Sequence, residues 1–269
     1  MKITPVEATL GAIVEDVELA QLTDADFEDI EAAWHQHGVL VFRNQHLSNE
    51  EHLAFSKRFG RLEMGLKRGP SSGLAHMSNI TKDGGVAKTT SLQHRFHLGN
   101  TYWHSDSSYK SVGAKASLLA AHVVPEEGGE TEWADMRAAY DVLDDEMKAY
   151  LDSKGAVHSY VYSHTWHGGL EIISEEDVKQ LPPVVHPIVR THAATGRKNL
   201  FVGRHASHIV GEDEEASRAL LKKLTEDACQ SPRTWKYKWQ PGDVCIWDNR
   251  CVLHRGHMWP EDQKRYMIR

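Results

Sequence analysis

The sequence predicts a mainly β fold, a sandwich or barrel with helices packed on the outside. Short apolar runs of strand length recur along the chain, and turns rich in Gly, Pro and Asp separate them. The helical patterns do not alternate regularly with these runs, which disfavours a doubly wound parallel sheet. We expect strands over residues 39–42, 117–124, 184–189, 200–202 and 244–247.

Four segments carry the periodicity and the end signals of helices. Thr23 fits an N-cap, acidic residues fill the turn that follows, and Gly38 ends this first helix. Ser48 and Glu51 have the spacing of a capping box, and Gly60 fits the C-cap of the same helix. We expect helices over residues 23–37, 48–59, 136–151 and 212–229.

Composition and charge narrow the class of protein. The chain has 269 residues, of which 40% are hydrophobic and 26% charged, as in ordinary globular domains. Its net charge of −7 argues against a bulk nucleic-acid binder, and its three cysteines form no CxxC pair. No stretch approaches the roughly 20 apolar residues of a membrane helix, and the N-terminus lacks the apolar core of a signal peptide. We therefore expect a cytoplasmic protein with neither a membrane nor a nucleic-acid partner.

The segment from about residue 65 to 100 shows little strand pattern. It is rich in Gly, Ser, Thr and Lys and contains His76, His94 and His97. A segment of this length without regular structure is either a surface excursion or a functional loop. We expect this segment to be a mobile lid over an active site, with His94 and His97 reaching the substrate bound there.

One histidine stands out by its spacing. Among 18 histidines, only His104 has an acidic residue, Asp106, two positions later. In a strand, residues i and i+2 face the same side, so both side chains would converge on one point. His254, beside a turn and a strand-like run, is the best third ligand. Two histidines and a carboxylate are typical of non-haem Fe(II), although a surface pair or a structural histidine fits this pattern equally well.

Motifs for other chemistries are absent from the sequence. It contains no HExxH, no GxGxxG after a strand, no Walker A loop and no GxSxG elbow. No spacing of Ser, His and Asp supports a nucleophilic triad. A zinc hydrolase lacks an obvious general base, so it is the weakest alternative.

Ordered segments along nearly the whole chain resemble one enzyme family. They are GAIVEDVELAQL, GVLVFRNQHLSNEEHLAFSKRFG, NTYWHSDSSY, VVPEEGGETEWADMRAAYDVL, HPIVRTHAATGRKNLFVGRHASHIVG, WQPGDVCIWDNRCVLHRG and KRYMIR. The chain resembles the Fe(II)/2-oxoglutarate-dependent dioxygenases of the taurine dioxygenase and 2,4-dichlorophenoxyacetate dioxygenase family. WHSDSS and GRHASHIVG resemble the aryloxyalkanoate branch more than the taurine branch.

The resemblance implies a single dioxygenase domain over residues 1–269. Its fold would be a distorted double-stranded β-helix, a jelly roll with flanking helices, and the protein would be a homo-oligomer. The matching positions are His104, Asp106 and His254 for the metal, Thr131, Trp239 and Arg265 for 2-oxoglutarate, and Asn100, Ser107 and Arg269 for the substrate.

Two arginines close the sequence. Arg265 and Arg269 are four residues apart, so on a strand both would face the same side, about 13 Å apart. One could clamp the cosubstrate carboxylate and the other a substrate acid, while ordinary exposed charges are the alternative. In relatives the strand runs on past the position of Arg269, so we expect the native chain to continue. A frayed end would leave the position of the Arg269 side chain open.

The implied reaction uses Fe(II), 2-oxoglutarate and O2. It hydroxylates a small anionic substrate, an aryloxyalkanoate by the branch resemblance, and gives succinate, CO2 and a phenol. His205 and His208 supply polar groups that could line the substrate pocket, although structural histidines are more common. Two alternatives remain open: a dioxygenase of alkyl sulfonates such as taurine, and a non-catalytic metal-binding jelly-roll sensor.

Overall fold

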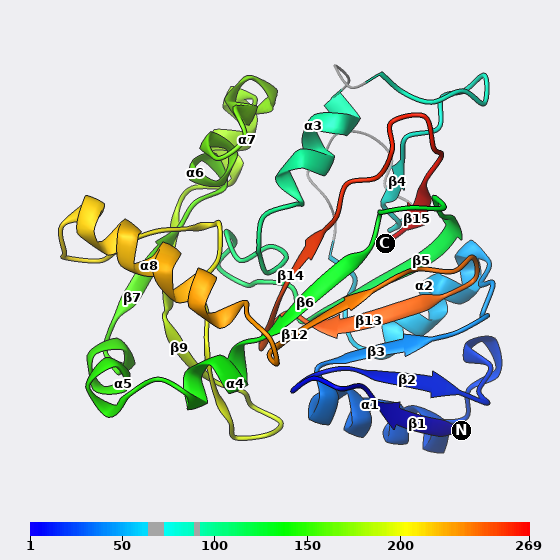
Figure 1. Ribbon diagram of the computed structural model, residues 1–269, viewed down its shortest axis with the longest axis horizontal. Coiled ribbons are helices and arrows are strands. Elements are labelled where there is room, and N and C mark those ends of the chain that lie inside the picture. The colour runs from blue at the N-terminus through cyan, green and yellow to red at the C-terminus, as the bar shows by residue number, and fades with distance from the viewer. Residues whose placement is uncertain (64–72, 89–91) are drawn as a thin grey trace.

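A seven-stranded sheet forms the larger β layer of the computed structural model (Figure 1), which describes residues 1–63, 73–88 and 92–269. In spatial order its strands are β1 (Lys2–Pro5), β2 (Ala12–Glu15), β3 (Val39–Phe42), β13 (Val244–Asp248), β5 (Ala116–Val123), β15 (Tyr266–Ile268) and β4 (His76–Ser78). All neighbours are antiparallel except β2 and β3, which are parallel. The mainly antiparallel order agrees with the prediction against a doubly wound parallel sheet.

Three smaller sheets complete the β structure of the described residues. They consist of β12 (Thr234–Tyr237), β6 (Thr131–Asp135) and β14 (Val252–Gly256); β11 (Ala206–Ile209), β7 (Gly155–His158) and β8 (Val184–Pro187); and β10 (Lys198–Leu200) with β9 (Val189–Thr191). The β12–β6–β14 sheet packs on the large sheet through a core in which the rings of Trp133 and Trp247 lie 6.1 Å apart. Strand β14, which carries the predicted ligand His254, is therefore backed by this core.

The central strand β13 is buried on both faces. Val244 and Ile246 face a core formed with the helices, whereas Cys245 and Trp247 face the β12–β6–β14 sheet. Alternate side chains of a strand point to opposite faces, so burial on both sides makes the strand read as one continuous apolar run. This is why 244–247 was predictable as a strand.

Helices α1 (Asp24–His37) and α2 (Asn49–Arg58) cover one face of the large sheet, as Figure 1 shows. Both begin with a capping box, at Thr23 and Ser48, as predicted. Gly38 ends α1 in the left-handed conformation with φ of 73°, and its N–H donates to the carbonyl of Trp34 at 2.7 Å. The caps fix where each helix begins, and the buried aromatic faces hold both helices against the sheet.

Some predicted elements prove to be divided. The helix predicted over 136–151 is wrong as a single element, because α4 (Met136–Asp141) ends and α5 (Asp145–Asp152) begins anew. Asp144 caps α5 by accepting the N–H of Met147 at 2.7 Å. The strand predicted over 184–189 divides at Ile188 because β8 pairs with β7, whereas β9 pairs with β10. The helix predicted over 212–229 is confirmed as α8 (Glu214–Ala228).

The segment predicted to lack regular structure contains two elements. Its residues 65–72 and 89–91 lie outside the described residues. Strand β4 pairs with β15, and α3 (Leu92–Gly99) precedes the His104 loop, so the expectation of an irregular segment is wrong for these parts. A strand of three residues that pairs with a distant segment leaves little periodic signal.

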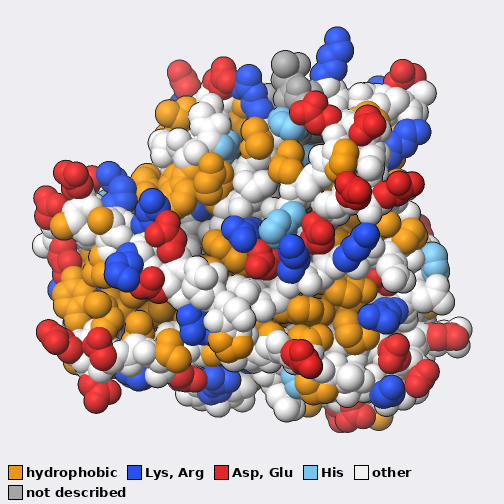
Figure 2. Space-filling model, in the orientation of Figure 1, with side chains coloured by type: hydrophobic (Ala, Val, Ile, Leu, Met, Phe, Trp, Pro, Cys, Tyr) orange, Lys and Arg blue, Asp and Glu red, His pale blue; other side chains and the backbone are white. Residues whose placement is uncertain are grey.

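Four further short helices were not predicted. They are η1 (Leu19–Gln21), α6 (Tyr160–Thr165), η2 (Gly169–Ile172) and α7 (Glu175–Gln180). None of the helices in the described part of the chain is long and apolar enough to cross a membrane. On the face shown in Figure 2, Lys and Arg side chains are mixed with Asp and Glu, and histidines lie near the centre.

Candidate active site

Backbone pairing brings the predicted metal ligands together. The N–H of His104 donates to the carbonyl of His254 at 3.0 Å, and the N–H of His254 donates back at 2.8 Å. This isolated bridge places the His104 loop beside β14. Asp106 begins a turn, so the prediction that His104 and Asp106 share a strand is wrong. Their side chains and that of His254 nevertheless offer ligand atoms within 4.8 Å of one another.

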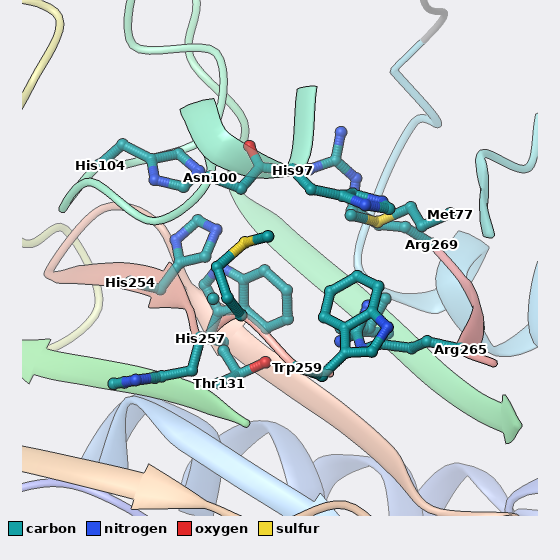
Figure 3. Close-up of a pocket in the computed structure, with 14 residues that line it drawn as sticks. Met77, His97, Asn100, His104, Thr131, His254, His257, Trp259, Arg265 and Arg269 are labelled. Carbon is teal, nitrogen blue, oxygen red and sulfur yellow. The ribbon is translucent and has the colours of Figure 1, made fainter. Parts of the chain in front are cut away.

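Hydrogen bonds orient the members of this cluster, two of which appear in Figure 3. Nδ1 of His104 lies 2.7 Å from the carbonyl of Tyr102, which leaves Nε2 turned toward Asp106. Nε2 of His104 lies 3.9 Å from Oδ1 of Asp106, and Nε2 of His254 lies 3.6 Å from Oδ2. The carboxylate also accepts hydrogen bonds from Ser117 at 2.6 Å and Arg269 at 2.8 Å.

The site favours the ligand forms of all three groups. Burial lowers the pKa of His104 well below its ordinary value and lowers the pKa of His254 to about 4. Both imidazoles are therefore neutral at pH 7. Burial works to raise the pKa of Asp106, but Arg269 and the two histidines outweigh it, and the pKa falls well below its usual range. Neutral imidazole and ionised carboxylate are the forms that bind metal ions.

Two cavities meet at this cluster. Met77, His97, Asn100, His104 and Arg269 line both of them. The first, drawn in Figure 3, extends toward Thr131, His257, Trp259 and Arg265. The second, of about 330 Å³, extends toward Tyr109, Tyr160, His164, His167, Arg204 and His205. We call them the Arg265 cavity and the Arg204 cavity.

Arg265 is a buried cation without an acidic partner among the described residues. The residue is only 6% exposed, and its Nη2 donates to the Gly129 carbonyl at 3.3 Å. Within the described part of the chain its Nε has no hydrogen-bond partner. Burial lowers its pKa to about 10. The guanidinium lies 5.0 Å from the ring centre of Trp259, and Thr131 lines the same cavity. Such a group can bind a carboxylate that enters the cavity.

Trp239 lies behind this cavity and does not line it. It is buried, and its Nε1 donates to Oγ1 of Thr131 at 3.1 Å. The tryptophan therefore orients the threonine hydroxyl. Its role beside bound 2-oxoglutarate stays a prediction.

Arg204 was not predicted as a site residue. It is 8% exposed, and its Nη1 donates to the Gly99 carbonyl. Its Nε has no hydrogen-bond partner among the residues that the structure describes. Burial lowers its pKa to about 10. No local pattern marked Arg204 as a site residue. Its position depends on a backbone hydrogen bond from its N–H to the carbonyl of Trp103, about 100 residues away in the sequence.

The remaining predicted residues differ in their positions. Asn100 lines both cavities, whereas Ser107 lines only the Arg204 cavity and donates to Glu63 at 2.7 Å. His97 lines both cavities, and His205 lines the Arg204 cavity. His94 and His208 are not among the lining residues of either.

Arg269 is held firmly at the end of β15. Its backbone exchanges two hydrogen bonds with Ala75, at 2.8 and 2.9 Å, and its side chain pairs with Asp106. Arg265 and Arg269 flank β15 and line the same cavity. This agrees with the expectation that both side chains face the same side of a strand.

A second group of ligand-type side chains lies behind the site. His192, Asp248 and Cys251 are buried within 4.8 Å of one another. However, both oxygens of Asp248 already accept hydrogen bonds from Arg250, and one lies 3.0 Å from Nε2 of His192. We therefore interpret this cluster as a structural one, in which Asp248 pairs with Arg250 and His192.

Comparison with known proteins decides the family. The family model described as taurine catabolism dioxygenase TauD, TfdA family, matches residues 2–269. The chain belongs to the TauD/TfdA family. It is 41% identical to an (S)-phenoxypropionate/alpha-ketoglutarate-dioxygenase of Sphingobium herbicidovorans, over 98% of this chain and 92% of the relative. It is 40% identical to an alpha-ketoglutarate-dependent 2,4-dichlorophenoxyacetate dioxygenase of Cupriavidus pinatubonensis, over 98% and 95%.

A solved structure extends the comparison to three dimensions. AAD-2 in complex with Mn(II) and N-oxalylglycine has a TM-score of 0.92 and 38% sequence identity, over 99% of this chain and 96% of that one. The predicted family and the predicted closeness to its aryloxyalkanoate branch are both confirmed. This TauD/TfdA member is therefore similar over its whole length to dioxygenases that depend on alpha-ketoglutarate.

Proposed function

We propose that this protein is an Fe(II)- and 2-oxoglutarate-dependent dioxygenase that hydroxylates an aryloxyalkanoate and releases succinate, CO2 and a phenol. The observation that carries the proposal is the position of His104, Asp106 and His254. They lie at the junction of two cavities, each of which holds a buried arginine without an acidic partner in the described chain. One cavity suits the cosubstrate and the other the substrate.

The donor set fits Fe(II). Two neutral imidazoles and one ionised carboxylate, all buried, are the ligands that non-haem iron enzymes use, and three protein ligands leave other positions open. The sequence holds no cysteine pair that would favour a thiolate zinc site instead. His104, Asp106 and His254 would hold the metal.

The Arg265 cavity fits the distal carboxylate of 2-oxoglutarate. A buried guanidinium needs an anion to offset its desolvation, and the free Nε marks an unused donor. Thr131, oriented by Trp239, offers a hydroxyl on the same cavity. Together they could grip one carboxylate group.

The Arg204 cavity fits an acid with an aromatic ring. Its volume of about 330 Å³ lies in the range of small-molecule sites. Arg204 supplies a positive charge, and the rings of Tyr109 and Tyr160, whose centres are 4.8 Å apart, supply flat apolar surface. Ring stacking and one charged contact match the two ends of an aryloxyalkanoate.

The chain's part in the reaction is to bind, orient and exclude water. When bound, the metal centre supplies the oxidative chemistry, coupling decarboxylation of 2-oxoglutarate by O2 to hydroxylation of a substrate C–H bond. Arg265 and Thr131 fix one end of the cosubstrate, and Arg204 fixes the acid end of the substrate. Hydroxylation beside the ether oxygen gives a hemiacetal, which collapses to a phenol and a 2-oxo acid.

The wider organisation is also part of the proposal. The large sheet and the β12–β6–β14 sheet face each other across one core, which supports a distorted jelly roll within a single domain over residues 1–269. We infer a homo-oligomer that acts on a small anionic substrate in the cytoplasm. Gel filtration with light scattering measures the oligomeric state.

A substrate screen tests the proposal. Purified protein with Fe(II), 2-oxoglutarate and O2 is assayed for succinate against aryloxyacetates, both enantiomers of aryloxypropionates, and alkyl sulfonates including taurine. We expect succinate and an equal amount of phenol with an aryloxy acid. Taurine turnover with no phenol from any aryloxy acid would contradict the substrate class, and no succinate with any compound would favour a non-catalytic sensor.

A further inference from the structure

Asn249 is a fully buried amide that contacts Asp106. The residue is 1% exposed and follows β13. Its Oδ1 accepts two hydrogen bonds at 3.1 Å each, from the backbone N–H of Asp106 and from Nε1 of Trp247. Both partners can only donate, so the oxygen and nitrogen of the Asn249 amide are assigned without ambiguity.

The same amide sets the direction of a second hydrogen bond. Nδ2 of Asn249 donates to Oγ of Ser117 at 2.9 Å, and Ser117 donates to Oδ2 of Asp106 at 2.6 Å. A serine hydroxyl has one proton. Because Ser117 accepts from Asn249, that proton is directed to the Asp106 carboxylate.

Buried backbone contacts hold this arrangement in place. Ser117 lies on β5 and pairs in register with Trp247 on β13. The backbone N–H of Asn249 donates to the carbonyl of Lys115 at 3.1 Å, and the carbonyl of Asn249 accepts from the hydroxyl of Ser105 at 2.8 Å. One amide thus links two strands of the large sheet to the loop that carries Asp106.

We propose that Asn249 and Ser117 are positioning residues for the metal site. Asn249 fixes the backbone of Asp106, and Ser117 fixes the rotation of its carboxylate. The inference rests on the proposed function, since it assigns these residues a role toward the ion that Asp106 would bind. Hydrogen-bond partners of metal ligands hold them in one orientation, and their loss commonly lowers metal affinity by about 10- to 100-fold.

The test measures metal affinity directly. Protein freed of metal with a chelator is titrated with Mn(II) in a calorimeter, for wild type, Ser117→Ala and Asn249→Asp. Ser117→Ala removes the hydroxyl donor, and Asn249→Asp replaces the amide donor by an acceptor, which turns the Ser117 proton away from Asp106. We expect Mn(II) to bind about 10- to 100-fold more weakly to both variants.

Ser217→Ala is the matched control. Ser217 lies on α8 and is 2% exposed. Its hydroxyl accepts the backbone N–H of Ile209 and donates to the carbonyl of Glu214. We expect this control to bind Mn(II) with wild-type affinity. We also expect the melting temperatures of chelator-treated Ser117→Ala and chelator-treated wild type to agree within about 3 °C. Wild-type affinity in Ser117→Ala and Asn249→Asp would overturn the inference. Failure of the wild type itself to bind Mn(II) would overturn the proposed function and this inference with it.

Discussion

The three arginines that line the cavities differ in what they contact. Arg269 pairs with Asp106, whereas Arg204 and Arg265 have no carboxylate partner among the residues described. Burying a cation without a counter-ion costs several kcal/mol, so both positions point to anions that arrive with ligands. The two arginines are therefore the residues whose replacement separates cosubstrate from substrate binding.

Replacing Arg265 affects the cosubstrate. We expect Arg265→Ala to raise the KM for 2-oxoglutarate about 100-fold, because a buried carboxylate loses a charge-assisted pair. Metal affinity changes little, since Arg265 does not contact Asp106. Steady-state kinetics with varied 2-oxoglutarate measure the effect, and an unchanged requirement for 2-oxoglutarate would refute this role.

Replacing Arg204 affects the substrate. We expect Arg204→Met to raise the KM for an aryloxy acid about 10- to 100-fold while the KM for 2-oxoglutarate stays near its wild-type value. Arg190→Met is the control, because Arg190 stacks on Phe201 and lines neither cavity. Equal effects of Arg204→Met on both KM values would assign Arg204 a general structural role.

Single residues were predictable where the signal is local. His104 and Asp106 share a short motif, and a strand-like run marks His254. Arg204 and Asn249 gave no such signal because each contacts residues more than 100 positions away, at Gly99 and Asp106. Their surroundings arise only when distant segments meet.

Elements show the same contrast between local and distant causes. The capping boxes of α1 and α2 and the continuous apolar run of β13 each consist of residues close together in the sequence. Those elements were therefore predicted. Strand β4 exists because it pairs with β15, whose residue Ile268 lies opposite His76. No periodicity within 65–100 could reveal that partner.

Helix α3 supports an expectation about ligand binding. His97 on α3 lines both cavities, and its ring centre is 5.0 Å from that of Trp259. We expect amide hydrogen exchange in α3 to slow when a 2-oxoglutarate analogue, a metal and an aryloxy acid are bound together. Exchange rates in α3 that do not change when these ligands bind would contradict the prediction that this segment forms a lid.

At the scale of the whole molecule, buried histidines link the stability of the fold to pH. Burial lowers the pKa of His52 and His254 to about 4 and that of His158 to about 3. Unfolding returns each to about 6.5, so the unfolded chain binds more protons below that pH. Their contribution to stability is present above pH 6.5 and is lost as the pH falls toward 3.

We therefore expect the unfolding free energy of chelator-treated protein to fall by a few kcal/mol between pH 7 and pH 4. Urea titrations at several pH values measure this slope. His158→Leu removes one buried group that must stay neutral, so its slope should be shallower than that of the wild type. An identical slope in the variant would show that His158 does not contribute.

We propose that one metal ion held by His104, Asp106 and His254 performs a 2-oxoglutarate-dependent oxidation. The most direct measurement titrates Fe(II) into chelator-treated protein with 2-oxoglutarate, O2 and an aryloxyacetate present, and follows succinate and phenol. We expect equal amounts of both products, saturation at one Fe(II) per chain, and no turnover by His254→Ala under the same conditions. Phenol formation without Fe(II), or wild-type turnover by His254→Ala, would contradict it.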